Sequence, residues 1–282
     1  MITAEQRELR RKYIGSSDSA AILGLSPFAN IADVYWNKVG HADQPENPSM
    51  KAGNQLEAVV LDYAEETIGK ELLRDQLTID DIFCANHDAL VCGTNHGVEA
   101  KTSGITGPGV NDQWGEPGTD QVPEHVLVQC QHQIMVAKLQ MVWVPALIGG
   151  RGFQMYEVHR DDQLIESMKR RLRKFWEEHV LCQMPPEDAL PSIDVIRRVR
   201  RVPEKITQMP GNVVEKWQEA KARLKVAKQE QEAAEALLLT YMGDAEAGDS
   251  DMGRVTFYEQ KRAGYTVEAS SFRVLRHAKR RI

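Results

Sequence analysis

The stretch HDALVCGTNHGVEAKT, residues 87–102, decides how the first half of the chain is expected to fold. An apolar run is followed by a segment rich in Gly and Asn and then by a second short run, which predicts a β-hairpin whose return strand is 98–102. Side chains two positions apart on a strand share a face, so Glu99 and Lys101 point the same way. Asp88 lies at the start of the hairpin, and Glu99 and Lys101 lie at its end. The sequence therefore predicts two carboxylates and a lysine gathered at one end of a β-hairpin.

These residue types match a metal centre. Carboxylate and carbonyl oxygens are the ligands that hard divalent cations prefer, so the candidate ligands are Asp88, Glu99 and the carbonyl oxygen of Ala100. Mg²⁺ is the expected cation, with Mn²⁺ as a substitute. A cation and an oriented water beside Lys101 would suit metal-assisted phosphodiester hydrolysis. The alternative is that Lys101 forms only a salt bridge with the acidic pair.

Two helices are expected to bring further polar groups to this hairpin. Apolar residues recur at helical spacing from Gln55 to Gly69, with Glu57 in the first turn, where an acidic residue could simply stabilise the helix dipole. A second helix is predicted over 126–138. Its Gln129 and Gln133 share a face at i and i+4, and Gln131 lies on the other side.

Polar residues on the second helix and near the N-terminus leave alternatives open. His132 is expected to be exposed on the second helix or to contact DNA. Near the N-terminus, Ser17 or Asp18 could cap a helix over 19–23 just after the basic residues 10–12. Basic side chains beside a helix N-terminus suit a phosphate, although a capped helix with a solvated basic patch would look the same.

The order of the motifs resembles a known family. The segments are IGSSDSAAILGLSP at 14–27, GNQLE at 53–57, DALV at 88–91, EAK at 99–101 and QCQ at 129–131. Their order across residues 9–140 resembles the YqaJ-type viral recombinases, which are lambda-type phage alkaline exonucleases of the PD-(D/E)xK nuclease superfamily. One departure is that Ala89 stands where the family usually has Gly. Asp80 and Asp81 are therefore alternative ligands to Asp88.

The resemblance implies roles for individual residues. Glu57 would contact a metal directly or through water, and Gln129 would face the active site and position it. Asp88 and Glu99 would bind the metal ions, and Lys101 would orient or help deprotonate the attacking water. By the same resemblance, Arg10 and Ser17 would hold the 5′-phosphate of the strand being digested.

The resemblance also implies a fold and an activity. The expected fold is α/β, a restriction-endonuclease-like core with a mixed central sheet flanked by helices. The expected activity is Mg²⁺-dependent 5′→3′ degradation of one strand of linear double-stranded DNA by a homotrimer, which leaves single strands for an annealing protein. The alternatives are a catalytically silent DNA-end-binding protein and a sequence-specific endonuclease on the same core.

Composition limits the setting. The 282 residues are 42% apolar, and the four cysteines are scattered with no C-x-x-C pair. Scattered cysteines predict a reducing cytoplasm, as for a phage or prophage protein in a bacterial host, and argue against zinc fingers, disulfide frameworks and iron–sulfur nucleases. No signal peptide or membrane-spanning run is expected.

The net charge of −6 conceals local basic clusters at 169–174, 197–201 and 276–281. Local clusters of this kind, not net charge, set phosphate attraction. The first is predicted on an amphipathic helix over 161–180, as either a DNA contact or a solvated face.

Three segments are expected along the chain. They are a nuclease core at 1–183, a linker with a basic cluster at 184–211, and a helical and β-hairpin appendage at 212–282. In the appendage, a helix to about Met242 carries a heptad pattern, and strands are predicted at 254–260 and 265–268. The heptad face is expected to pack on a neighbouring helix of the same chain, with a docking arm for a partner as the alternative.

Overall fold

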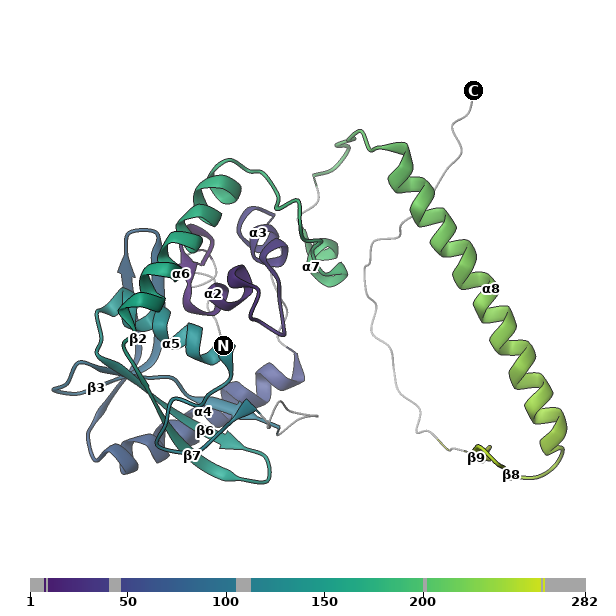
Figure 1. The fold of residues 1–282 in the computed structure, drawn as a ribbon, viewed down its shortest axis with the longest axis horizontal. Coiled ribbons are helices and arrows are strands. Elements are labelled where there is room, and N and C mark those ends of the chain that lie inside the picture. Colours follow the sequence, from purple (N-terminus) through teal and green to yellow (C-terminus); the bar gives the residue numbers. More distant parts are fainter. Residues whose placement is uncertain are drawn as a thin grey trace. The chain divides into compact units, whose positions relative to one another are not determined.

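The computed structural model describes residues 8, 10–40, 47–104, 113–199, 202–259 and 261 (Figure 1). By its internal contacts the chain forms two compact units, Met1–Arg201 and Val202–Ile282. The first contains the hairpin and all the candidate site residues. The second contains the long helix.

A seven-stranded mixed sheet forms the centre of the first unit. The strands are β1 (Ile14–Gly15), β2 (Leu72–Asp80), β3 (Phe83–Val91), β4 (His96–Val98), β5 (Lys101–Ser103), β6 (Met141–Ile148) and β7 (Gly152–His159). The order β1-β3-β4-β6-β5 runs through the sheet, with β2 antiparallel to β3 and β7 antiparallel to β6. β4 and β5 both run parallel to β6.

The predicted hairpin is present, because β3 and β4 pair antiparallel with Ala89 opposite Val98. The expected return strand 98–102 is not continuous. It divides into β4 and β5, and Glu99 and Ala100 lie between them. There the amide of Glu99 donates to the carbonyl of Trp143 at 2.9 Å, and the amide of Ala100 donates to Oδ2 of Asp88 at 2.8 Å. A side chain thus replaces a backbone partner at the break.

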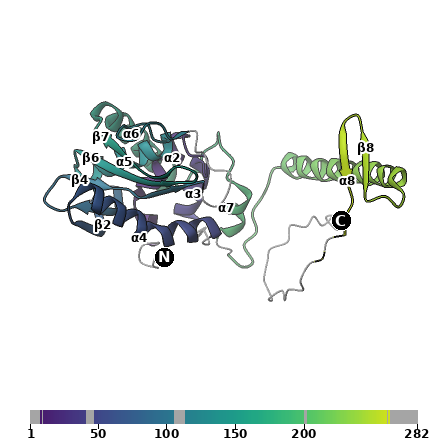
Figure 2. The ribbon, with the colours of Figure 1, turned by 90° about the horizontal axis from the view of Figure 1, so that it is seen from below.

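Helices cover both faces of the sheet (Figure 2). They are α2 (Ser16–Leu23), α3 (Ile31–Val39), α4 (Pro48–Ile68), α5 (Glu124–Ala137), α6 (Asp162–Phe175), which continues as the π-helix η2 (Trp176–Leu181), and α7 (Ile193–Arg198). On one face, α4 packs through Leu61 and Ala64 against Ala89, Val91 and Val98 of the sheet. On the other, α5 lies between the sheet and the pair α2 and α6.

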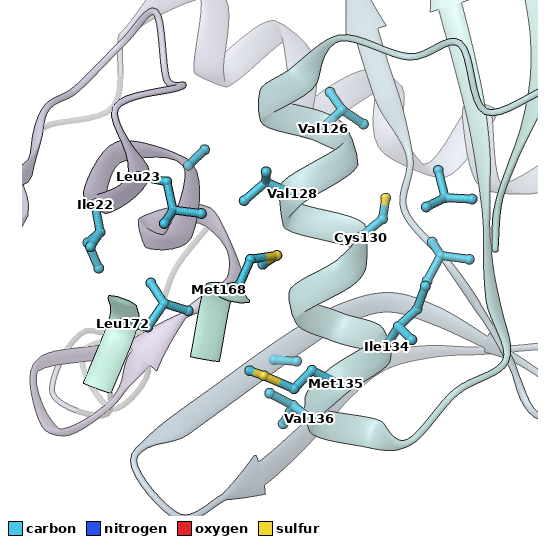
Figure 3. Close-up of a cluster of buried hydrophobic side chains, with 14 of the residues drawn as sticks. Ile22, Leu23, Val126, Val128, Cys130, Ile134, Met135, Val136, Met168 and Leu172 are labelled. Carbon is cyan, nitrogen blue, oxygen red and sulfur yellow. The ribbon is translucent and has the colours of Figure 1, made fainter. Parts of the chain in front are cut away.

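The larger core surrounds α5 (Figure 3). Val128 faces Ile22 of α2 and Met168 of α6, whereas Cys130 and Ile134 face the sheet. The basic helix was predicted correctly, because the apolar residues of α6 point inward and its Leu172 is fully buried. α5 is buried nearly all round because helices and sheet enclose it. Burial of this extent removes apolar surface from water on every side of α5 and fixes its rotation.

Two helices begin earlier than expected. α4 starts at Pro48, and the side chain of Asn47 caps it by accepting from the amide of Met50, so Glu57 lies in the third turn and not the first. The helix-dipole explanation for Glu57 is therefore wrong. α2 starts at Ser16 with Gly15 as the N-cap residue, so neither Ser17 nor Asp18 is the cap.

The segment after η2 packs against α3 within the first unit. The amide of Ser192 donates to Oδ1 of Asp33 at 2.6 Å, and Nδ2 of Asn30 donates to the carbonyl of Leu190 at 3.0 Å. Val195 of α7 is buried. Much of the segment expected as a linker is therefore ordered against α3, although the Arg200 and Arg201 part of its basic cluster lies outside the described residues.

In the second unit, α8 (Gly211–Met242) matches the predicted helix, and β8 (Ala247–Ser250) pairs with β9 (Gly253–Thr256). This hairpin differs from the expected one, since β9 pairs with a strand before it in sequence. The expected strand 265–268 and the basic tail 276–281 lie outside the described residues. Within 202–259 no second helix accompanies α8, and the expected packing of its heptad face on another helix of the chain stays a prediction.

Across the described parts of the chain, no helix is both long and apolar enough to cross a membrane.

Candidate active site

A cleft of about 510 Å³ opens between α4 and the break between β4 and β5. Its lining includes Glu57, Asp88, Glu99, Ala100 and Lys101. The residues expected as metal ligands and as the water-orienting lysine therefore share one cleft. They reach it from α4, from β3, from β5 and from the break between β4 and β5.

A second hollow of about 210 Å³ lies beside this cleft and shares Asp88 and Glu99 with it. Its other lining residues include Arg10, Ser17 and Gln129. The two hollows thus bring every sequence-predicted site residue to the same pair of carboxylates. By contrast, Asp80 and Asp81 line neither hollow, and Asp81 instead forms an ion pair with Arg173 on α6.

Asp88 is held by the backbone at the strand break. Its Oδ2 accepts the hydrogen bond from the amide of Ala100, which fixes the carboxylate against the backbone that follows Glu99. Burial, and next the negative charge of Glu99, raise the pKa of Asp88 well above its usual value. Two carboxylates placed this close in a buried site favour a cation between them or a proton on one of them.

Glu99 is surrounded by donors and is only 3% exposed. Its Oε1 accepts from Nε2 of Gln129 at 2.6 Å and from Nζ of Lys101, and its Oε2 accepts from Nε2 of Gln133. Nζ of Lys101 also donates to Oε1 of Gln129 at 3.1 Å. The salt bridge that the sequence left as an alternative reading of Lys101 is present, and it lies inside the cleft.

Lys101 carries its proton in this arrangement. Burial alone would lower the pKa of Lys101, but the charges of Glu99 and then Asp88 raise it overall. An ammonium group can orient a water or stabilise negative charge, but it cannot accept a proton.

Glu57 faces the same cleft from α4. Burial, then the charges of Asp75 and Glu99, raise the pKa of Glu57. Asp75 was not expected near the site. It lies at an irregularity in β2, where its φ is 54°. The pairs on either side, Arg74 with Ala89 and Gln76 with His87, keep one register, so Asp75 stands opposite Asp88. Nothing in the local sequence signals this irregularity.

The polar residues of α5 divide as the helical spacing predicts. Gln129 and Gln133 reach Glu99, whereas Gln131 bonds the carbonyl of His159 at 2.6 Å. Gln133 is fully buried and was not named as a site residue, although its i+4 relation to Gln129 was the signal for it. His132 is neither exposed nor a DNA contact. It is fully buried between Ser19 and the carbonyl of Cys84.

The N-terminal side of the second hollow rests on a buried lysine. Nζ of Lys38 forms a 2.5 Å ion pair with Asp18 and donates to the carbonyl oxygens of Arg10 and Tyr13. Burial would raise the pKa of Asp18, but Lys38 lowers it overall. Asp18 also accepts from the amide of Gly15 at 2.9 Å. Lys38 thus fixes the backbone that presents Arg10 and Ser17.

Part of the basic cluster 169–174 serves the fold. Arg171 donates to the carbonyl of Leu23 at 3.3 Å, and Arg173 pairs with Asp81 and lies 5.5 Å above the ring of Phe83. These two side chains cover α2 and the start of β3, so they are not purely a solvated face.

The donor set fits a hard divalent cation. Two carboxylates and a backbone carbonyl at one end of a cleft are oxygen ligands of the kind that Mg²⁺ and Mn²⁺ take, usually with waters completing the shell. Among the described residues, no three His, Cys, Asp or Glu side chains converge as a metal-binding group.

The mixed sheet, its flanking helices and the cleft define an exonuclease-like fold, as predicted. The structure is similar to an alkaline exonuclease, LHK-Exo, from Laribacter hongkongensis, with a TM-score of 0.52 and 18% identity over 64% of this chain and 94% of that one. The structure of LHK-Exo in complex with dAMP is similar to the same extent, with a TM-score of 0.53 and 18% identity over 64% of this chain. The likeness is one of fold.

The sequence identifies the domain more closely. Residues 6–140 match the model of the YqaJ-like viral recombinase domain, the family that the order of motifs resembles. The chain is also 30% identical over 185 residues to the protein YqaJ of Bacillus subtilis (strain 168). That match covers 63% of this chain and 56% of YqaJ, so the chain spans little more than half of that relative.

Proposed function

We propose that this protein is a divalent-metal-dependent exonuclease that degrades one strand of linear double-stranded DNA in the 5′→3′ direction. The observation that carries the proposal is that Asp88, Glu99 and Lys101 meet at one end of a cleft in an exonuclease-like fold. The structural comparison supports it, because the alkaline exonuclease LHK-Exo has a similar fold and was also solved in complex with dAMP.

Each residue has a role in this proposal. Asp88, Glu99 and the carbonyl of Ala100 would bind the cation, and Glu57 would contact it directly or through water. Mg²⁺, or Mn²⁺ in its place, would supply charge stabilisation of the phosphate and a more acidic bound water. Lys101, held as an ammonium by Glu99, orients the attacking water toward the phosphorus. Gln129 forms hydrogen bonds with both Lys101 and Glu99 and so holds the two side chains in place relative to each other.

The lining of the second hollow supports the proposed direction of digestion. Arg10 and Ser17 line it beside Asp88 and Glu99, so a terminal 5′-phosphate bound there would place the nearby phosphodiester at the carboxylates. Arginine binds phosphate by paired charge-assisted hydrogen bonds, which suits end recognition.

Assembly and partners are proposed from the family resemblance. A homotrimer would let the protein stay on its track while it digests, and the exposed single strand would pass to an annealing protein. Light scattering should then give a mass of three times the 31.8 kDa chain or a multiple of that. A mass of one or two chains would contradict the trimer.

One assay separates this function from its alternatives. Purified protein with Mg²⁺ is incubated with linear duplex carrying a label at either the 5′ or the 3′ end of one strand, and with closed circular duplex. The proposed exonuclease releases the 5′ label first and leaves the circle intact. Cutting of the circle would indicate an endonuclease, and binding of ends without release of either label would indicate a silent end-binding protein.

A further inference from the structure

The helix α8 presents a continuous unpartnered stripe. None of its residues is buried, and within 202–259 no other helix accompanies it. Leu224 is 58% exposed, Leu238 39% and Tyr241 86%. These side chains belong to a heptad stripe, here called the α8 seam, which consists of Trp217, Ala220, Leu224, Ala227, Gln231, Ala234, Leu238 and Tyr241. Residues at alternating three- and four-residue steps lie along one side of a helix, so the α8 seam is a single strip.

The charges beside the α8 seam are divided by sign along the helix. The flanking positions of the N-terminal half carry Lys216, Lys221, Arg223 and Lys228, and those of the C-terminal half carry Glu230 and Glu235. One half of the flank is therefore positive and the other half is negative. A second helix of the same sequence lying antiparallel would offset them.

We propose that α8 pairs with α8 of a second copy of this chain in an antiparallel two-helix coiled coil. The layers support this orientation. In the antiparallel pairing, Trp217 faces Tyr241 at the ends, and the inner layers set a large side chain against a small one: Leu224 against Ala234, Leu238 against Ala220, and Gln231 against Ala227. Such layers have similar volumes and interdigitate. In a parallel pairing, leucine layers would alternate with layers of two alanines, which leaves voids.

The flanking charges select the same orientation. The antiparallel pairing sets Lys221 against Glu235 and brings Lys216 near Asp244, just beyond the helix end, while Lys228 and Glu230 each meet their own copies at the centre. A parallel pairing would oppose like charges in each of its three charged flanking contacts. Those contacts would be Lys216 with Lys221, Arg223 with Lys228, and Glu230 with Glu235. The pairing is two-fold symmetric and so doubles whatever assembly the first unit forms.

Cysteine cross-linking of the full chain tests the pairing directly. The exposed Cys92 and Cys182 are first replaced by Ser, which leaves only the buried Cys84 and Cys130. Leu224→Cys and Ala234→Cys proteins, of which one carries a mass tag, are mixed and oxidised. The antiparallel pairing predicts a disulfide between the two different proteins and little within either alone. Dominant self-linking of Leu224→Cys would show a parallel pair, and no disulfide in any sample would show no pair. Either result overturns the proposal.

The matched control uses Ala222→Cys and Ala236→Cys, which lie at the same heights on the opposite side of α8. They should not cross-link, and cross-linking as efficient as that of the seam pair would overturn the assigned face.

Charge reversal gives a second, independent measurement. Glu235→Lys should weaken the pairing roughly tenfold in sedimentation equilibrium, and Lys221→Glu combined with Glu235→Lys should restore it, because the contact is remade with opposite signs. Nuclease activity should stay unchanged in all these variants. A double variant as weak as the single one would overturn the assigned contact.

Discussion

Gln133 donates a hydrogen bond from Nε2 to Oε2 of Glu99, so the carboxylate expected to bind metal is fixed from within the protein core. The other carboxylate oxygen of Glu99, Oε1, accepts from Gln129 and Lys101 on the side of the cleft. Glu99 therefore depends on α5 for its orientation as much as on the backbone between β4 and β5.

Replacement of Gln133 by Met tests this dependence. The shape is nearly kept, but the bond to Glu99 is lost, so the Mg²⁺ concentration for half-maximal activity should rise, or the rate at saturating Mg²⁺ should fall, by roughly tenfold or more. Gln131→Met is the matched control, since Gln131 is also buried on α5 but bonds the carbonyl of His159. Thermal unfolding should shift similarly in both variants. Equal Mg²⁺ dependence in both would show that Gln133 is only a packing residue.

Substitutions in the proposed metal centre should separate chemistry from folding. Glu99→Ala or Lys101→Ala should lower the rate of hydrolysis by about 10²-fold or more while DNA binding persists, because the sheet beneath supports the site. Asp88→Asn should behave alike, since Asn can still accept the bond from the Ala100 amide. Single-turnover digestion and a DNA-binding titration measure the two effects. More than half of the activity in all three variants would refute the metal centre.

Arg10→Ala should impair recognition of the DNA end. A charge-assisted phosphate contact contributes about 1.5–3 kcal/mol, so digestion of 5′-phosphorylated duplex should slow roughly 10- to 100-fold, with less effect on 5′-hydroxyl duplex. Arg11→Ala is the control, because Arg11 pairs with Glu8 at 2.7 Å and does not line the second hollow. Equal slowing on both substrates would make Arg10 a general backbone contact.

The buried His132 should make stability depend on pH. Burial lowers the pKa of His132 from 6.5 to about 4, and its Nδ1 accepts from Ser19 when Nε2 donates to the carbonyl of Cys84. Between these pH values the unfolded chain binds a proton that the folded protein excludes. This contribution is complete above pH 6.5 and is lost at about 1.4 kcal/mol per pH unit as the pH falls toward 4.

Urea unfolding at a series of pH values measures this slope. His132→Gln should reduce it, whereas His159→Gln should not, because the His159 side chain is 68% exposed. If His132→Gln leaves the slope as steep as in the unaltered chain, the burial of His132 in the folded protein is not what makes its stability pH-dependent.

Short-range spacing in the sequence determined much of the site. Strand alternation predicted that Glu99 and Lys101 lie together, and they do, although the strand is broken at Glu99. Gln129 and Gln133 share a face because a helix repeats near four residues. The inward face of α6 and the extent of α8 followed from the same periodicities. These features depend on residues within a few positions of each other, so a local pattern is sufficient to predict them.

Only the tertiary structure decided which of these elements meet. His132 looked like a surface residue because its own helix gives no sign that α2 and β3 enclose it. Lys38 bonds Asp18 and the backbone that precedes it, and these residues are too far apart in the sequence for a local pattern to predict the contact. The side chain of Asp88 accepts from the amide of Ala100 and interrupts the strand there. Such contacts join residues far apart in the chain, and they form because burial leaves each polar group to find a partner inside the fold.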